Sequence, residues 1–331
     1  MRLAMPHNAP ASLFVHGVMH RIKTYNAISS KGLDRFELER YEVGQDIANP
    51  DALLLRSYKL QEEEIPDSVT AIARAGAGVN NIPLARCSER GIPVFNTPGA
   101  NANAVKELVV AAMLLASRDI VGGIAFAQSQ EATMSAQDMN ALMEREKKRF
   151  AGAELEGKTL GVVGLGAIGS LVARMGLDFG MDVVGFDPAL SVEAAWRLPS
   201  DVQRMENVQS LVSRSDFVSL HLPVLDSTRG LVNAEMLSHF KQGSCLLNFA
   251  REEIVSIDAV VSALNGGQLR RYVTDFPHPR LLGRQDTLLM PHIGASTAEA
   301  EENCAVMAAN QLRAFLEHGN IRNSVNFPAI E

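Results

Sequence analysis

Residues 158–187, KTLGVVGLGAIGSLVARMGLDFGMDVVGFD, constrain the fold more than any other stretch of this chain. An apolar run leads into a turn that contains Gly164, Gly166 and Gly169, and a helical pattern and a second apolar run ending at Asp187 follow. Strand, glycine-rich turn, helix, strand and acid occur in this order in dinucleotide-binding units. The first glycine allows a tight turn, the second lets backbone approach a pyrophosphate, and the third lets helix and strand pack closely. Since the helix N-terminus also presents free N–H groups to phosphate, we expect a dinucleotide site rather than a bland turn.

The acid at the end of the second strand predicts which dinucleotide binds. The carboxylate of Asp187 would accept hydrogen bonds from a ribose 2′-hydroxyl and would repel a 2′-phosphate. The stretch PALSVEAAW that follows contains no Arg to pair with such a phosphate. The sequence therefore favours NAD over NADP.

Composition limits the classes of protein to which this chain can belong. The 331 residues are 47% hydrophobic and 21% charged, which is enough for two domains with separate cores. The net charge of −7 argues against a general affinity for nucleic acid. The three cysteines, Cys87, Cys245 and Cys304, are widely spaced, which is typical of reduced thiols in a cytoplasmic protein without a disulfide or metal site.

Neither a membrane span nor a secretory signal is indicated. The longest apolar runs are far shorter than the roughly 20 residues that cross a bilayer. The N-terminal stretch MRLAMPHNAPASLFVHGVMH contains one Arg and no sustained apolar segment, so it does not match a signal peptide. We interpret residues 1–20 as a loosely held extension or as the result of an early start codon.

The central position of the glycine-rich turn predicts two α/β domains. Strand-like runs alternate with helical patterns on both sides of it, at residues 52–55, 69–74, 93–95, 217–222, 245–249, 272–275 and 287–290. Such alternation predicts doubly wound domains around parallel sheets. We expect a Rossmann domain at 100–289, inserted into a flavodoxin-like substrate-binding domain formed by 1–99 and 290–331, with hinges near residues 100 and 290. Other expected features are helices at 102–117 and 298–318 and a polar arm at 128–149.

Charged side chains follow several of these strand-like runs. Arg56 and Ser57 follow the first run, Arg74 ends the second, and Arg251 and His292 follow two later runs. In open α/β sheets, ligands bind outside the carboxyl ends of the strands. Guanidinium groups bind carboxylate or phosphate through paired hydrogen bonds, and His carries protons near neutral pH. Together with NAD, these residues indicate oxidation of an alcohol on an anionic substrate. Taken singly, each Arg could instead form a surface ion pair and the His could be structural.

The chain is similar to the D-isomer-specific 2-hydroxyacid dehydrogenases, and within them to the D-3-phosphoglycerate dehydrogenase branch. The resemblance extends over residues 20–328. The segments that match the superfamily are the glycine-rich fingerprint, LLLRS (53–57), HLPVLDSTRGLVN (221–233), LLNFAR (246–251) and MPHIGAST (290–297). The segment ARAGAGVNNIPLARCSERGIPVFNTPGANANAVKE (73–107) contains RAGAGVNN and NTPGAN, which are specific for the phosphoglycerate branch.

This resemblance implies NAD-dependent oxidation of 3-phospho-D-glycerate to 3-phosphohydroxypyruvate, the first step of serine biosynthesis, or reduction of a related 2-keto acid. It also implies a homodimer, whereas the cytoplasmic location and the absence of binding to nucleic acid or a membrane are expectations from composition. Arg251 would bind the substrate carboxylate and polarise the C2 oxygen. His292 would take the proton of the C2 hydroxyl as hydride leaves for the nicotinamide.

Further binding residues are implied by the resemblance alone. The remaining substrate ligands would be Arg56, Ser57, Arg74, Gly76, Ala77, Gly78 and Asn101. NAD would be bound by Gly164, Gly166, Ala167, Ile168, Asp187, Pro188, His221, Pro223, Thr228, Ala250 and Asp275. In relatives, a basic segment like EKKRF, which contains Lys147, can reach the neighbouring subunit's substrate phosphate; the alternative here is a solvated helix face.

The chain departs from the family pattern in three places. Relatives carry a Glu, commonly as Phe-Pro-x-Glu, that orients the catalytic His, and Pro279 stands at this position here. Relatives usually have Arg-Gly-Gly where this chain has Arg251, Glu252 and Glu253. The sequence ends at NSVNFPAIE, where an ACT regulatory domain follows in close relatives, so a form without that domain is expected.

Two functions therefore remain open at this point. The first is a working NAD-dependent dehydrogenase, which the presence of Arg251 and His292 favours. The second is a catalytically weak homologue that binds NAD and acts as a sensor or interaction protein, because the usual Glu is missing. Glu252 or Glu253 could replace that acid if the loop after Arg251 folds back toward His292.

Overall fold

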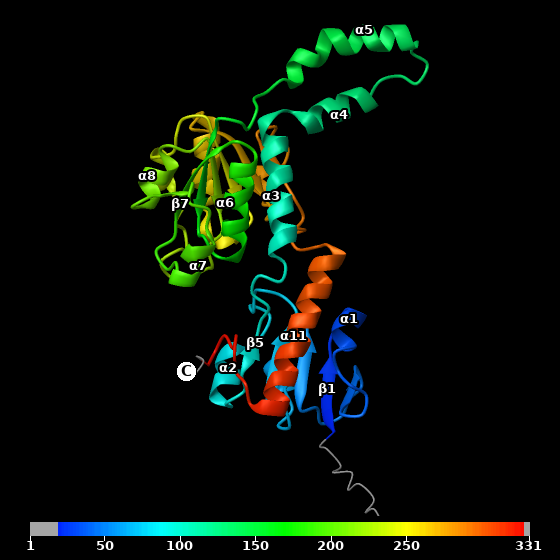
Figure 1. The fold of residues 1–331 in the computed structure, drawn as a ribbon. Coiled ribbons are helices and arrows are strands. Elements are labelled where there is room, and N and C mark those ends of the chain that lie inside the picture. Colours follow the sequence, from blue (N-terminus) through cyan, green and yellow to red (C-terminus); the bar gives the residue numbers. More distant parts are fainter. Residues whose placement is uncertain (1–18, 328–331) are drawn as a thin grey trace, which may run out of the picture. The chain divides into compact units, whose positions relative to one another are not determined.

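The computed structural model describes residues 19–327, apart from the side chains of residues 193 and 197. Contacts divide this part of the chain into two units. The first unit contains the residues up to Thr97 and those from Glu302 onward, and the second unit contains Pro98–Glu301 (Figure 1). Residues 290–301, which were expected in the substrate-binding domain, lie in the second unit by their contacts. These residues stay with the second unit because Ile293 and Gly294 donate backbone hydrogen bonds to Asp275. The expected loose extension at residues 1–20 lies outside the described residues up to residue 18, and it is wrong at His20, which begins β1.

The first unit contains a five-stranded parallel sheet in the order β2-β1-β3-β4-β5. This is the flavodoxin-like order, as expected from the sequence. Its elements are β1 (His20–Thr24), α1 (Ser30–Leu33), β2 (Tyr41–Gly44), β3 (Ala52–Leu55), η1 (Glu62–Glu64), β4 (Ala71–Arg74), α2 (Leu84–Glu89), β5 (Val94–Phe95) and most of α11 (Ala298–His318).

The core of the first unit forms on its central strands. All four residues of β3 are fully buried, and two of them, Leu53 and Leu55, pack in one cluster with Ile72 of β4 and Val94 of β5. Continuous apolar runs form central strands because both faces of a doubly wound sheet are covered. Helix α11 is tied to this sheet by a hydrogen bond of 2.5 Å from the Tyr41 hydroxyl to Glu317 and by one of 3.0 Å from Gln311 to the carbonyl of Asn96.

The second unit contains a seven-stranded parallel sheet in the order β12-β11-β10-β9-β6-β7-β8. Counted from β6, this is the Rossmann order extended by one strand, so the fold class expected from the sequence is confirmed. Its elements are α3 (Ala102–Ser117), α4 (Ile120–Gln128), α5 (Ala136–Glu146), η2 (Lys147–Phe150), β6 (Thr159–Val163), α6 (Ala167–Asp178), β7 (Asp182–Phe186), α7 (Val192–Arg197), β8 (Gln203–Arg204), α8 (Val208–Val212), β9 (Phe217–Leu220), α9 (Ala234–Ser238), β10 (Ser244–Asn248), η3 (Glu252–Ile254), α10 (Ile257–Asn265), β11 (Leu269–Thr274), η4 (Pro279–Leu281) and β12 (Thr287–Leu289).

Helix α3 belongs to the core of this second sheet. Val109, Ala112, Met113 and Ala116 are fully buried, and their spacing of three and four residues puts them on one face of the helix. They pack in one cluster with residues of β6 and α6. Because the buried stripe of α3 covers this sheet, the helix stays with the dinucleotide fold rather than with the first unit.

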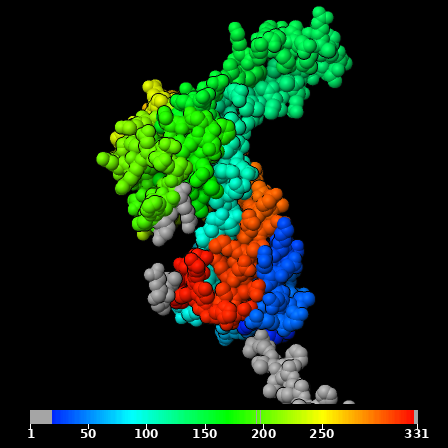
Figure 2. Space-filling view, in the orientation of Figure 1, coloured from blue at the N-terminus to red at the C-terminus, as the bar shows by residue number. Residues whose placement is uncertain are grey.

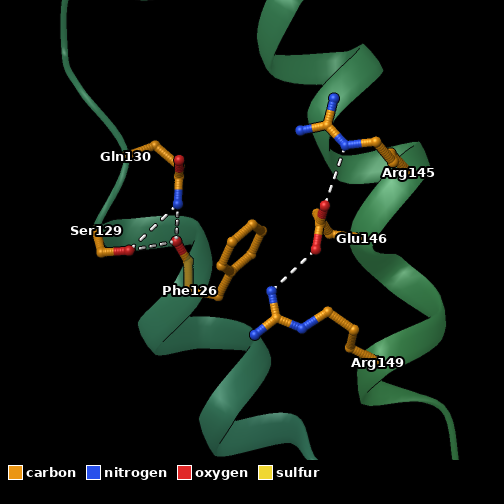
Figure 3. Close-up of polar contacts among 6 residues, drawn as sticks. All are labelled: Phe126, Ser129, Gln130, Arg145, Glu146 and Arg149. Carbon is orange, nitrogen blue, oxygen red and sulfur yellow. Dashed lines mark hydrogen bonds and ion pairs between the residues drawn. The ribbon is translucent and has the colours of Figure 1, made fainter.

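The polar arm expected at 128–149 contains α5 and most of η2, and together with the preceding helix α4 it projects from the rest of the second unit (Figure 1, Figure 2). Figure 3 shows the polar contacts of this hairpin: within α5 and η2, Glu146 accepts hydrogen bonds from Arg145 (3.0 Å) and Arg149 (2.9 Å). Both hydrogen bonds lower the pKa of Glu146, and the bond from Arg149 has the larger effect. The guanidinium of Arg149 also lies 5.3 Å from the ring centre of Phe126 and 5.5 Å from that of Phe150. The arm is therefore an ordered helical hairpin.

Among the described residues, no single helix is long and apolar enough to cross a membrane. The pair α3 and α4 passes this test only when the two are taken together, and they are bent by 72°.

Candidate functional site

The three glycines of the turn between β6 and α6 have three different roles. Gly164 has φ +92°, and a Cβ there would lie 2.5 Å from the carbonyl oxygen of His221. A Cβ on Gly169 would lie 1.8 Å from the carbonyl oxygen of Gly164, so the helix can approach the turn only without a side chain. Gly166, at the N-cap of α6, has nothing within 4 Å of its Cβ position. The open space at Gly166 fits the approach of a pyrophosphate to the helix N-terminus.

Asp187 lies next to this turn, one residue after the end of β7. Its carboxylate accepts hydrogen bonds from the backbone N–H of Leu165 (2.8 Å) and of Ala189 (2.9 Å). The side chain is partly exposed, as is that of the neighbouring Ile168, while Gly166, Ala167 and Pro188 are exposed. The carboxylate is therefore fixed against the turn and keeps acceptor capacity for a ribose hydroxyl.

The loop after β9 carries three more residues implied to contact NAD. The His221 ring is hydrogen-bonded through Nε2 to the Ser219 hydroxyl (2.8 Å), and its buried Nδ1 has no partner among the described residues. Burial lowers the pKa of His221 to about 3, so the imidazole is neutral at physiological pH. Thr228 donates to the carbonyl of Pro223 (2.7 Å) and accepts from the N–H of Leu225 (2.8 Å), so its hydroxyl shapes this loop.

Arg251 follows β10 on a loop that a buried amide holds. Asn248, the fully buried last residue of β10, donates to the carbonyl of Arg251 (2.9 Å) and accepts from the N–H of Ala250 (3.1 Å). The Arg251 guanidinium is partly exposed and donates to the carbonyl of Ala250 (2.6 Å). The sequence analysis did not single out Asn248, although an amide at the end of an otherwise apolar strand could have marked it.

His292 follows β12 and is exposed. Its backbone has φ +58°, the left-handed region, and its ring meets the edge of Phe276 with ring centres 5.1 Å apart. The next two peptides are fixed by Asp275, whose carboxylate accepts from the N–H of Ile293 (2.8 Å) and of Gly294 (2.7 Å). Asp275 is 3% exposed, so both of its oxygens are used inside the protein.

No acid takes the place of the missing Glu in the described part of the chain. Pro279 is exposed and begins η4, and the His278 ring caps this turn by accepting a hydrogen bond of 3.2 Å from the N–H of Arg280. Glu252 and Glu253 are exposed residues of η3, and no described contact joins either carboxylate to His292. The possibility that one of them had moved into the role of the Glu has no support in this geometry.

The first unit gathers its candidate residues at the carboxyl ends of β3 and β4. Arg74 donates to the carbonyl of Arg56 (3.0 Å) and to that of Gly78 (2.6 Å). A Cβ on Gly76 would lie 2.6 Å from Nη1 of Arg74, so this glycine makes room for the guanidinium. Ser57 is exposed beside Arg56, which is partly exposed. Arg74 therefore joins the loop after β3 to the loop after β4.

Two amide side chains, which the sequence analysis did not single out, also hold the loops of the first unit. Asn81 donates to the carbonyls of Arg56 (3.1 Å) and Tyr58 (2.7 Å), and Asn96 donates to the carbonyl of Ala77 (2.6 Å). Asn101 lies in the second unit, at the N-cap of α3, and its buried Oδ1 has no partner among the described residues. The candidate residues thus form two groups on different units rather than one set from a single sheet.

In the part of the chain that the structure describes, no cluster of three His, Cys, Asp or Glu side chains could hold a metal ion.

Known proteins share this arrangement of sheets and loops. Residues 110–294 match the family described as D-isomer specific 2-hydroxyacid dehydrogenase, NAD binding domain. A hydroxypyruvate reductase of Thermotoga maritima is 36% identical over 282 residues, which cover 81% of this chain and 86% of that protein. The chain belongs to the D-isomer-specific 2-hydroxyacid dehydrogenase family. A D-3-phosphoglycerate dehydrogenase of Methanocaldococcus jannaschii is 34% identical over 302 residues, which cover 88% of this chain.

The dehydrogenase fold and its cofactor agree with solved structures. The NAD+-bound 3-phosphoglycerate dehydrogenase of Entamoeba histolytica has a TM-score of 0.74 and 25% identity, and the match covers 94% of this chain and 99% of that one. The expectation of NAD as the cofactor is confirmed by the family and by the fit of the glycine turn. The match covers only 55% of the Methanocaldococcus enzyme, so this chain spans little more than half of that relative's length.

Proposed function

We propose that this protein is an NAD-dependent D-2-hydroxyacid dehydrogenase that acts on 3-phospho-D-glycerate, or in reverse on 3-phosphohydroxypyruvate. The observation that carries the proposal is the placement of Arg251 and His292 on loops after β10 and β12. These loops belong to the same sheet whose β6–α6 turn fits NAD. The second unit therefore contains a cation that can bind a carboxylate, a residue that can carry a proton and a turn that fits a dinucleotide. Nothing in this site favours a sensor without turnover.

The chemistry assigned to this chain is binding and proton transfer. Gly166 and Asp187 would hold NAD, whose nicotinamide would supply the acceptor for the hydride from C2 of the substrate. Arg251 binds the substrate carboxylate and stabilises negative charge on the C2 oxygen, a role that suits its partly exposed guanidinium. His292 takes the hydroxyl proton in the oxidation and returns it in the reduction.

A phosphorylated substrate is favoured by the loops of the first unit. Arg56 and Ser57 offer a guanidinium and a hydroxyl after β3, and Arg74 holds the backbone on both sides. The resemblance of RAGAGVNN to the phosphoglycerate branch supports the same substrate. A second candidate is hydroxypyruvate without the phosphate, which the name of the Thermotoga relative supports.

A substrate panel distinguishes the two candidates. NADH oxidation is measured with 3-phosphohydroxypyruvate, hydroxypyruvate and glyoxylate, in the wild type and in Arg56→Ala and Ser57→Ala. We expect a higher kcat/KM for the phosphorylated acid, and Arg56→Ala should remove about 1.5–3 kcal/mol of that preference, the scale of a hydrogen bond to a charged group. Arg86→Ala is the control, because Arg86 is an exposed residue of α2 paired with Glu89. Equal kcat/KM values for the two hydroxypyruvates would exclude the phosphorylated assignment and leave the family activity standing.

We also propose that the protein forms a homodimer through α4. This helix, IVGGIAFAQ, has no buried residue, and Val121 and Ile124 are 49% and 53% exposed. Apolar side chains on a projecting helix gain stability when a second copy covers them. Analytical ultracentrifugation of a Val121→Glu/Ile124→Glu variant should show monomers. Val192→Glu, at an apolar residue of α7 that is 71% exposed, should leave the dimer intact.

Two smaller assignments remain proposals. Lys147 is exposed and pairs with Glu144, as a residue on a solvated helix face would. Contact of Lys147 with the substrate phosphate of a second copy is the alternative proposal. A reducing, cytoplasmic location is supported by the burial of three widely spaced cysteines, Cys87, Cys245 and Cys304.

A further inference from the structure

A cavity lies on the first unit, between α11 and the segment of chain that follows it. Its volume of about 310 Å³ is at the lower end of the range, roughly 300–1,000 Å³, that small-molecule sites occupy. One wall is a face of α11 that extends from Asn303 to Ala314, and residues 320–323 form the other (Figure 1). The lining residues belong to the first unit alone, and they include none of the residues assigned to substrate or NAD.

The second wall of this cavity is held at both of its ends. At the end of α11, the N–H of Asn320 donates to the carbonyl of Ala314 (3.2 Å). Directly beyond the wall, the N–H of Val325 donates to the carbonyl of Val94 (2.8 Å) in β5, the edge strand of the sheet. Because helix and sheet both hold this short segment, the cavity is part of the fold and does not depend on a ligand for its shape.

Side-chain amides with free hydrogen-bonding capacity line the cavity. The exposed side chains of Asn303, Asn310 and Asn323 make no hydrogen bond with other described residues. Gln311 is 9% exposed, and its Nε2 donates to the carbonyl of Asn96 (3.0 Å). Its buried Oε1 has no partner among the described residues, and such an oxygen normally binds a protein group, a water or a ligand. The cavity thus offers several uncharged donors and acceptors.

Arg322 is the one charged residue in the described lining of the cavity. It is exposed, and its guanidinium forms no ion pair or hydrogen bond with other described residues. A guanidinium binds a phosphate or carboxylate through paired hydrogen bonds. Since no acid belongs to the described lining, an ammonium group on a ligand would have no counter-charge there. The lining therefore favours a ligand with an anionic group and an uncharged polar body over an amino acid or a polyamine.

The body of such a ligand is indicated by the side chains between the amides. Val306 and Met307 are partly buried and give the cavity an apolar surface. Nucleobases bind proteins in this way, with their flat faces on apolar side chains and their edges in paired hydrogen bonds to Asn or Gln. We propose that this cavity binds a nucleoside monophosphate, with its phosphate on Arg322 and its base among the amides of α11. This site is separate from the NAD site of the second unit.

Two hydrogen bonds connect the cavity to a substrate loop of the same unit. Gln311 donates to the carbonyl of Asn96 (3.0 Å), and Nδ2 of Asn96 donates to the carbonyl of Ala77 (2.6 Å). Ala77 lies in the segment 76–78 that family resemblance assigns to the substrate. A nucleotide that binds the Gln311 amide therefore acts on this loop through Asn96, and it changes the affinity for substrate. This effect on the substrate rests on the proposed function, whereas binding of the nucleotide does not.

Equilibrium dialysis of the full chain tests binding, with AMP, GMP and UMP as probes. NADH is added at a concentration that fills the turn after β6, because NADH also contains an adenylate group. At least one of the three nucleotides should bind, more tightly than inorganic phosphate or ribose 5-phosphate. Arg322→Ala should weaken its binding about 10-fold or more, the scale of a bond to a charged group, and Asn310→Ala about 2–10-fold. The control Arg86→Ala, at an exposed Arg of α2 that pairs with Glu89, should not.

Three results of the dialysis would overturn the site: no binding of any of the three nucleotides, equal binding of inorganic phosphate, or release of the nucleotide by NADH. Kinetics test the effect on the substrate loop. The nucleotide that binds should change KM for 3-phosphohydroxypyruvate about 5-fold or more in the wild type, and less in Arg322→Ala at the same concentration. An unchanged KM with the nucleotide bound would overturn the connection through Asn96. If the wild type reduces no 2-keto acid, the proposed function fails while the dialysis still decides the site.

Discussion

Two glycine-containing loops follow strands at the carboxyl edges of the two sheets, and their glycines serve opposite purposes. In the second unit, the Cβ position of Gly166 faces open space, which leaves room for a ligand to reach the backbone. In the first unit, the Cβ position of Gly76 is occupied by the protein's own Arg74, 2.6 Å away. A glycine after a strand therefore indicates a close approach, but the approaching group can be a cofactor or a neighbouring side chain.

The difference extends to how each loop is fixed. The turn after β6 is fixed by backbone packing, with the carbonyl of Gly164 against Gly169. The loop after β4 is fixed by the guanidinium of Arg74, which binds the carbonyls of Arg56 and Gly78. Substitutions in the first loop should thus change folding or cofactor binding, and substitutions in the second should change substrate binding.

The largest effect is expected within the glycine fingerprint itself. Gly169→Ala places a methyl group 1.8 Å from a carbonyl oxygen that cannot move away without opening the turn. Overpacking of this kind commonly costs about 1–3 kcal/mol or more, and here it meets backbone, so the melting temperature should fall sharply. Gly166→Ala meets nothing within 4 Å and should keep the wild-type melting temperature while losing NADH affinity. Calorimetry and NADH fluorescence titration measure the two effects, and equal melting temperatures would contradict this assignment.

The second-largest effect should be confined to substrate binding. Arg74→Ala removes two hydrogen bonds that hold the loops after β3 and β4. Each bond to a charged group contributes about 1.5–3 kcal/mol, so KM for 3-phosphohydroxypyruvate should rise strongly and KM for glyoxylate less. Gly76→Ala should reproduce the effect by displacing the guanidinium. Kd for NADH is the control; a large change in it would mean that Arg74 does not act through the first unit alone.

Cofactor discrimination should depend on Asp187 by a smaller amount. Asp187→Ala should weaken NAD binding by about 1–3 kcal/mol and affect NADP little. Part of the loss reflects the turn, because the carboxylate also accepts the N–H of Leu165. Isothermal titration with both dinucleotides measures the difference. Equal wild-type turnover with NAD and NADP would show that the acid does not select the cofactor.

The smallest expected effect is a gain in kcat. Pro279→Glu puts a carboxylate at the position of the missing acid, and an acid beside a His stabilises imidazolium and raises its pKa. We expect a partial increase in kcat and a shift of its pH profile to higher pH. The increase is limited because Pro279 is exposed and starts a turn capped by His278. An unchanged pH profile would indicate that the loop does not bring position 279 to His292.

Much of the fold could be predicted because its elements carry strong local patterns. The residue limits expected for β3, α3 and α11 are those observed, since apolar runs and buried stripes mark them. Strands β1 and β2 were missed: β1 reads HRIKT, in which Ile22 is the one apolar residue, so no apolar run marks this strand. The site was harder to predict, because its support depends on tertiary contacts. Asn81, Asn96 and Asn248 bind loop carbonyls, and no local spacing marks such residues.

The most direct test of the account is NADH oxidation by the wild type and by His292→Gln, with 3-phosphohydroxypyruvate and hydroxypyruvate as substrates. If the fold binds NAD through the fingerprint and the side chains carry the chemistry, both proteins bind NADH with the same Kd. Turnover is then saturable in the wild type and about 10²–10⁴-fold lower in the variant, the scale of general acid–base catalysis. NADH binding without turnover of either acid by the wild type, or undiminished turnover by His292→Gln, would contradict the account.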